Sequence, residues 1–194
     1  MRKITFDIET KNFFHDVNSN EPSALDISVV CIHDSLDDSY QSFFEKDFPK
    51  LWPILEKADI LITWNGNHFD IPLLNKYYSG DLSKIRSIDL MHEVREVIGR
   101  RLKLDTVAEA TLGRNKIANG IEAVDWWNQG KLDKLVEYCI EDVKITKQLY
   151  DYAIAHGILK YKDLGVGGTV RDIKLNTSGW ETTPDHAMTF TLPF

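Results

Sequence analysis

Apolar and polar residues alternate through residues 2–9 with the two-residue period of a β-strand. One side of this strand would consist of Ile4, Phe6 and Ile8. The other side would carry two carboxylates, Asp7 and Glu9. The pattern therefore predicts a strand with an apolar side for packing and an acidic side that needs a separate explanation.

Further segments rich in β-branched and apolar residues are predicted as strands: 26–34, 39–44, 59–64 and 84–89. The first two would pair antiparallel around the Asp37-Asp38 turn. Apolar residues at helical spacing predict helices over 47–57, 70–78, 89–98, 104–112 and 131–156. We expect a loop over residues 10–24 and an irregular segment over 113–125.

Strands come first along the chain and then alternate with helices, an order typical of an α/β fold with a mixed sheet. We expect one domain over residues 1–157. Residues 158–194 are expected to extend the same domain, with a hairpin of 159–164 against 170–175 and then a tail. A chain of 194 residues is long enough to bury a core without disulfides or a structural metal.

Composition places the chain among ordinary globular proteins, with 43% hydrophobic and 27% charged residues. No apolar run approaches the ~20 residues that a membrane span needs, so we expect no membrane association. The first residues lack the apolar core of a signal peptide. Cys31 and Cys139 lie in apolar segments without metal-site spacing, which favours reduced, buried thiols in a cytoplasmic protein.

The net charge of −7 argues against a protein that binds nucleic acid through a broad basic surface. An enzyme that binds a few nucleotides at one end remains compatible with this charge. Part of the acidity would then belong to the active site and be neutralised by bound cations.

Asp7 and Glu9 would lie on one side of the first strand, ~6.6 Å apart along it. Two carboxylates this close repel unless a cation lies between them, and Mg²⁺ or Mn²⁺ prefers such oxygen ligands. A solvent-exposed strand surface is the competing interpretation. It is weakened because the first strand of an α/β sheet is usually covered on both faces.

Asp70 follows the fourth predicted strand and the Asn65-Gly66 turn, at the strand end where α/β proteins place ligands. The same residue has a structural interpretation of equal weight, as a cap of the helix that contains Pro72 in its first turn. The pattern alone does not choose between the two.

The long helix carries an apolar stripe that consists of Leu132, Leu135, Cys139, Val143, Leu149 and Ala153. Asp142 falls on the edge of this stripe, and Tyr138 lies one turn before it. A carboxylate beside the core is costly unless it is paired or binds a metal. An internal basic or polar partner for Asp142 is the alternative.

Taken together, the four acids Asp7, Glu9, Asp70 and Asp142 are placed where an α/β fold can bring them to one sheet edge. Four acids suit a site for two cations ~3.5–4 Å apart that clamp a phosphodiester.

Three blocks of the sequence, FDIET, WNGNHFDIP and YCIED, resemble the exonuclease motifs of the DEDD group in the RNase H-like superfamily. The spacing from Tyr138 to Asp142 is similar to that of the tyrosine subclass, since the histidine subclass would need His where Glu137 stands. The middle block and residues 101–113 also resemble the proofreading exonuclease domains of family-B DNA polymerases. The resemblance covers about residues 1–155.

The resemblance implies an RNase H-like fold and a 3′→5′ exonuclease that uses two divalent cations, Mg²⁺ or Mn²⁺. Asp7, Glu9 and Asp142 would ligate one cation, and Asp70 would support the second, which Asp7 bridges. Tyr138 would orient the attacking water, a role that suits a phenol with pKa ≈ 10 better than that of a base. On weaker grounds, the resemblance also implies that Thr10 and Asn65 lie near the terminal nucleotide.

The substrate implied is a nucleic-acid 3′ end, single-stranded DNA first and RNA second, with 5′-mononucleotides as products. The chain would act alone or with a polymerase, helicase or other repair partner. A non-catalytic binding module on the same fold and a metal-dependent phosphatase are the competing functions. The sequence leaves the choice between DNA and RNA open, because it does not place contacts to the 2′-hydroxyl.

Overall fold

The computed structural model describes residues 1–114, 120–163, 165 and 167–182. Its main sheet has the strand order β3-β2-β1-β4-β5. The strands are β1 (Lys3–Thr10), β2 (Ile27–Asp34), β3 (Ser39–Phe43), β4 (Ile60–Thr63) and β5 (Ser87–Asp89). β1, β2 and β3 pair antiparallel, whereas β1, β4 and β5 are parallel. The predicted strands and the mixed sheet are therefore confirmed.

The helices are α1 (Phe48–Glu56), α2 (Asp70–Asn75), α3 (Leu90–Ile98), α4 (Leu104–Leu112), α5 (Gly120–Asn128) and α6 (Leu132–His156). Short 3₁₀ turns are formed by Pro22–Ala24, Glu45–Asp47 and Leu82–Lys84. A second, two-stranded sheet consists of β6 (Ile158–Asp163) and β7 (Thr169–Lys174), as the predicted hairpin requires. α4 and α6 end at Gly113 and Gly157, both in the left-handed conformation that glycine adopts easily.

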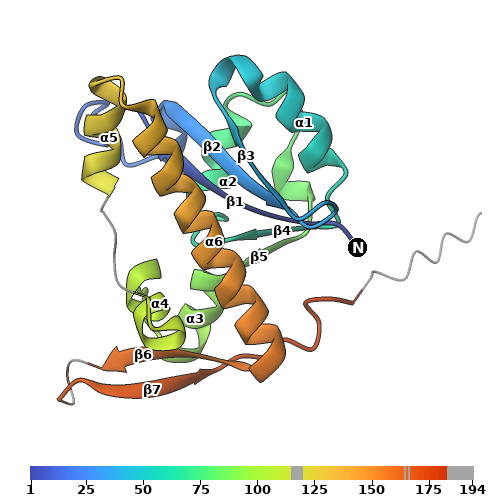
Figure 1. The fold of residues 1–194 in the computed structure, drawn as a ribbon, viewed down its shortest axis with the longest axis vertical. Helices are drawn as coiled ribbons and strands as arrows, with labels where there is room; N and C mark the ends of the chain where they lie inside the picture. The colour runs from blue at the N-terminus through green and yellow to red at the C-terminus, as the bar shows by residue number, and fades with distance from the viewer. Residues whose placement is uncertain (115–119, 164, 166, 183–194) are drawn as a thin grey trace, which may run out of the picture.

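One face of the main sheet is covered by α1 and α2 (Figure 1). The apolar side of β1, formed by Ile4, Phe6 and Ile8, packs into a cluster with side chains of these helices. In α1 the buried positions are Phe48, Leu51 and Leu55, at the spacing of one helical face. This packing fixes the orientation of β1 and so turns Asp7 and Glu9 toward the opposite face.

The opposite face is crossed by the long helix α6 (Figure 1). Leu135, Cys139 and Val143 of this helix are buried against Val29 and Cys31 of β2. The predicted stripe was wrong at Leu132, which is 39% exposed, because it is the first residue of α6 and lies beyond the part that packs on the sheet. The remaining apolar residues of the stripe pack on the sheet, and they place α6 over the side of β1 that carries Asp7 and Glu9.

The hairpin β6–β7 closes the lower end of the molecule in Figure 1. Its buried residues Leu159, Tyr161 and Ile173 share a cluster with Ile60 and Ile62 of β4. This shared core supports the predicted union of residues 1–157 and 158–194 in one domain, which stays a prediction.

The prediction of an irregular segment over 113–125 was wrong for its second half, because α5 begins at Gly120. Residues 115–119 of that segment lie outside the described residues. Gly120, Val124 and two tryptophans give this stretch low helix propensity. Burial of Ala123 and Val124 stabilises the helix, and α5 contacts both α6 and β1.

Two expectations about the environment of the chain can be compared with the structure. None of the helices in the described ranges is both long and apolar enough to traverse a lipid bilayer. Cys31 and Cys139 are both free and buried.

Candidate metal and catalytic site

Three carboxylates from two elements converge between the sheet and α6. Carboxylate oxygens of Asp7, Glu9 and Asp142 all lie within 4.8 Å of one another. β1 supplies the first two from its acidic side, and α6 supplies the third from the edge of its apolar stripe. Three hard oxygen donors without histidine or thiolate in the set fit Mg²⁺ or Mn²⁺ better than a softer metal.

The end of β1 is open on the side of β4, and Asp70 occupies that opening. β1 and β4 pair only from Lys3 to Thr5, so the backbone N–H of Ile8 has no partner on β4. The Asp70 carboxylate accepts a hydrogen bond from this N–H, between the two predicted metal ligands of β1. Asp70 is thereby fixed beside the cluster formed by Asp7, Glu9 and Asp142.

The helix-cap interpretation of Asp70 is not what the structure contains. Phe69 is the N-cap residue of α2 and makes no side-chain capping bond, while Asp70 is the first helical residue. Asp70 is only 4% exposed, and its charge acts on both Asp7 and Glu9. It lies outside the group of three carboxylates whose oxygens are within 4.8 Å of one another, and its role at a second cation stays a prediction.

Burial and mutual repulsion make this cluster electrostatically unfavourable in the absence of a cation. Burial, followed by the charges of its acidic neighbours, raises the pKa of Asp7 well above the usual range, and the same two causes raise the pKa of Glu9. Burial and the nearby Asp89 raise the pKa of Asp70 to about 8. A divalent cation would relieve this repulsion, as expected for a metal site.

Tyr138 lies one helical turn before Asp142, and its hydroxyl is hydrogen-bonded to that carboxylate. Burial, and then the charges of Asp142, Glu9 and Asp7, raise the pKa of Tyr138. The phenol is therefore a neutral hydrogen-bonding group at physiological pH. Its ring meets Trp126 of α5 edge to face, at 5.8 Å between centroids. This packing holds the hydroxyl on the side of the acids.

The turn before Asp70 is held by Asp89, a residue that the sequence motifs did not single out. Its carboxylate accepts hydrogen bonds from the backbone N–H groups of Asn65 at 2.8 Å and Asn67 at 3.1 Å. The same carboxylate caps α3 through the N–H groups of Met91 and His92. An aspartate just before an apolar-periodic helix is a capping signal, but its reach across to the 65–67 turn depends on the parallel pairing of β4 and β5.

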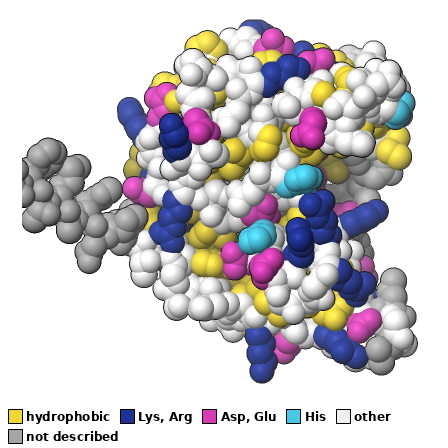
Figure 2. Space-filling view, turned by 180° about the vertical axis from the view of Figure 1, so that it is seen from behind, with side chains coloured by type: hydrophobic (Ala, Val, Ile, Leu, Met, Phe, Trp, Pro, Cys, Tyr) yellow, Lys and Arg dark blue, Asp and Glu magenta, His cyan; other side chains and the backbone are white. Residues whose placement is uncertain are grey.

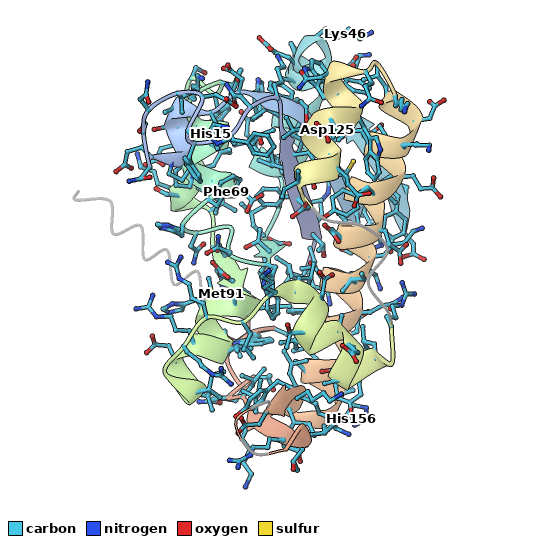
Figure 3. The ribbon with its side chains drawn as sticks, turned by 90° about the vertical axis from the view of Figure 1, so that its left-hand side faces the viewer. His15, Lys46, Phe69, Met91, Asp125 and His156 are labelled. Carbon is cyan, nitrogen blue, oxygen red and sulfur yellow. The ribbon has the colours of Figure 1, made fainter. Side chains whose placement is uncertain are left out.

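A groove of about 670 Å³ opens beside Glu9 and Tyr138. It is lined by both predicted metal-site and predicted substrate-site residues, among them Glu9, Thr10 and Tyr138. In Figure 3, His15 and Phe69 lie on one side of β1, and Asp125 of α5 lies on the other. Phe69 packs edge to face against Phe14, so it forms part of the wall of the groove.

The two predicted substrate residues differ in their present contacts. Thr10 lines the groove and donates a hydrogen bond from Oγ1 to the carbonyl of Asn12 at 2.9 Å. Asn65 lies in the turn that leads to Asp70 and adopts φ of 73°. Its Oδ1 is buried without a hydrogen-bond partner among the described residues. Thr10 follows Glu9 in β1 and Asn65 lies in the turn before Asp70, and the contact of both residues with a nucleotide stays a prediction.

Loss of the cations should be visible in the stability of the protein. At a pH between its unfolded and its folded pKa, a carboxyl whose pKa is raised by folding is protonated in the folded protein and ionised in the unfolded chain. We therefore expect the stability of the cation-free protein to fall from pH ~4 to pH ~8, by up to about 1.4 kcal/mol per pH unit for each such carboxyl. Because a cation favours the ionised form, Mn²⁺ should raise Tm more at pH 8 than at pH 5.5.

The measurement is thermal unfolding in EDTA and in Mn²⁺ at both pH values, with Asp7→Asn as the variant in which the cation effect is reduced. Equal stabilisation by Mn²⁺ at the two pH values, or equal stabilisation of Asp7→Asn and the parent protein, would contradict a cation site at this cluster.

Comparisons with known proteins bear on the whole region. A family model described as the RNase_H superfamily matches residues 4–154. DNA polymerases of Pyrococcus glycovorans and Thermococcus aggregans are each 29% identical to this chain over 47% of its length. The matched regions cover only 15% and 7% of those two polymerases.

Among solved structures, the family B DNA polymerase from the archaeon Pyrobaculum calidifontis has a similar fold. The TM-score is 0.62 at 20% sequence identity, and the match covers 79% of this chain and 24% of the polymerase. This likeness agrees with the mixed sheet and flanking helices described above.

Proposed function

The chain belongs to the RNase_H superfamily, and from this premise we propose that it is a nuclease that hydrolyses phosphodiester bonds with the help of divalent cations. Membership confirms the resemblance drawn from the three motifs. The observation that carries the proposal is the convergence of Asp7, Glu9 and Asp142 within 4.8 Å, with the Tyr138 hydroxyl hydrogen-bonded to Asp142.

The finer activity proposed is a 3′→5′ exonuclease that releases 5′-mononucleotides, with single-stranded DNA preferred over RNA. The motif order and the tyrosine spacing support the direction of cleavage. DNA is favoured because the two relatives at 29% identity are DNA polymerases. A polymerase or helicase partner is compatible with the proposal, since this chain matches only a small part of those relatives.

In this mechanism Asp7, Glu9 and Asp142 would hold one divalent cation, and Asp70 would help to hold a second beside Asp7. When bound, these cations supply an activated water and offset the negative charge that develops on the leaving 3′ oxygen. Tyr138 donates or accepts a hydrogen bond that orients the attacking water, since its raised pKa excludes the phenolate at neutral pH.

The protein supplies the remaining catalytic help through fixed positions. The Ile8 N–H holds Asp70, and Asp89 holds the turn before it, so the acids of β1 and α2 keep their spacing before substrate arrives. Groups that are already positioned need no reorganisation during reaction, which is the main electrostatic advantage of an enzyme site. The groove beside Glu9 would receive the end of the strand.

The proposal is tested with oligonucleotides labelled at one end. A 5′-labelled single strand should give a ladder of shortened products with Mg²⁺ or Mn²⁺, and a 3′-labelled strand should release labelled mononucleotide at once. EDTA should stop both reactions. RNA and duplex substrates in the same assay decide the preference for sugar and strand.

Intact 3′ ends of both DNA and RNA with either cation would overturn the proposal. Binding of single strands without turnover would support the non-catalytic module instead. Hydrolysis of a mononucleotide ester but not of an oligonucleotide would indicate a phosphatase.

A further inference from the structure

A second hollow, of about 190 Å³, is lined in part by Asn65 and Asn67 of the turn that precedes Asp70. We call it the arginine hollow, and its basic lining residues are His68, His92, Arg95 and Arg101. All four of these side chains are exposed. Figure 2 shows, on this face of the molecule, histidines with several Lys and Arg side chains gathered beside them.

The two arginine side chains of this hollow are not neutralised by ion pairs with acidic side chains among the described residues. Within the described residues, neither Arg95 nor Arg101 forms an ion pair, whereas Arg2, Lys11 and Lys76 each do. Asp89 also lines the hollow, but its carboxylate is already occupied by four backbone N–H groups. The arginines therefore present charge to the solvent in a chain whose net charge is −7.

The segment before α4 contributes side chains to both the hollow and the catalytic groove. Lys103 lines the groove that contains Glu9 and Tyr138, while Arg101, two residues earlier, lines the hollow. The backbone is extended at Lys103, with φ of −77° and ψ of 149°. Side chains two residues apart in extended backbone are ~6.6 Å apart, so the segment carries positive charge from one depression to the other.

We propose that the arginine hollow, together with Lys103, binds backbone phosphates of a single-stranded nucleic acid whose 3′ end occupies the catalytic site. This inference rests on the proposed function. Guanidinium groups recognise phosphate oxygens through paired hydrogen bonds, and such contacts position a strand without reading its sequence. The location favours nucleic acid, because residues 68–69 and 101–103 each contribute to the lining of both depressions, so a strand that leaves the acidic site in this direction reaches the hollow.

The test compares two double variants in a background that carries Asp142→Asn, so that the strand is not cut. Arg95→Ala with Arg101→Ala removes two charges from the hollow. Lys46→Ala with Lys57→Ala removes two exposed charges near α1, and Figure 3 shows Lys46 at the end of the molecule remote from Met91. Fluorescence anisotropy with a labelled 12-nucleotide single strand gives Kd across a series of salt concentrations.

The hollow variant should raise Kd about tenfold at low salt and lower the slope of log Kd against log salt by about 1.4, or ~0.7 for each lost phosphate contact. The control pair should change neither value by a comparable amount. Equal Kd and equal slope in the two double variants would overturn the proposal, as would binding of polyglutamate but not of the oligonucleotide.

The two proposals fail in distinguishable ways. If the parent protein shortens 3′ ends but the hollow variant binds strands normally, the nuclease proposal stands and the phosphate site is wrong. If the parent protein cuts nothing but loses strand binding when the arginines are removed, the phosphate site stands and the nuclease proposal is wrong.

Discussion

Replacing Asp142 with Asn is expected to lower kcat for 3′-end cleavage by about 1,000-fold or more. Asp142 contributes an oxygen to the group of three that lies within 4.8 Å, and it is also the hydrogen-bond partner of Tyr138. Asn removes the charge that holds the cation and changes the acceptor that orients the phenol. Loss of about 4 kcal/mol of transition-state stabilisation corresponds to this factor.

The substitution should leave the fold intact, because Asn occupies nearly the same volume and removes repulsion that raises the pKa of Asp7 and Glu9. Without cations, Asp142→Asn is therefore expected to match or exceed the parent protein in Tm. Its Tm should rise less on addition of Mn²⁺. Activity and stability thus move in opposite directions, as is common for residues of functional sites.

The matched control is Asp133→Asn, an exposed aspartate in the first turn of the same helix. This change should alter kcat less than twofold and lower stability by a few tenths of a kcal/mol, since it removes a favourable charge near a helix N-terminus. The measurement is kcat on a 5′-labelled single strand for the parent and both variants. Near-normal turnover by Asp142→Asn would exclude this residue from the catalytic site.

Much of the site was predictable because two periodicities are local properties of the chain. The two-residue period of β1 places Asp7 and Glu9 together, and the spacing of Tyr138 and Asp142 places them on one side of α6. The same patterns predicted the main strands and all helices except α5. Their catalytic roles stay predictions until the variants are measured.

What the sequence did not reveal depends on contacts between distant segments. The bond from the Ile8 N–H to Asp70 exists because β1 and β4 separate after Thr5, and no local pattern reports where two parallel strands diverge. The role of Asp89 in the 65–67 turn has the same origin. α5 was missed because packing, and not propensity, stabilises it.

Gly66 shows how a correct local prediction can have a different physical reason. An Asn-Gly pair predicts a turn in which glycine takes the left-handed conformation. In the structure Asn65 takes that conformation, with φ of 73°. Gly66 is needed for space instead, because a Cβ there would lie 2.3 Å from Thr63 Oγ1 and 2.4 Å from Thr63 Cβ.

Gly66→Ala is accordingly expected to be the most damaging single-methyl change near the site. Thr63 is fully buried at the end of β4, and its β-branched side chain has little freedom to move away. Overpacking of this kind costs about 1–3 kcal/mol, or roughly 3–10 °C in Tm for a chain of this length. Thermal unfolding in EDTA measures this cost without a contribution from bound cations.

The change should also reduce activity beyond its effect on folding. Gly66 accepts the hydrogen bond from the N–H of Ile71 at 2.9 Å, so a displaced turn moves the start of α2 and with it Asp70. A displacement of about 1 Å at a catalytic group costs on the order of 100-fold in rate. We therefore expect kcat to fall by about that factor at temperatures where the variant is still folded.

Gly179→Ala is the control, because a Cβ at that position meets no atom within 4 Å. It should change Tm by less than ~2 °C and leave kcat unchanged, as surface substitutions usually do. If Gly66→Ala kept both the Tm and the kcat of the parent protein, the close approach of Gly66 to Thr63 would not control the position of Asp70. The geometry of the acidic cluster would then depend on β1 and α6 alone.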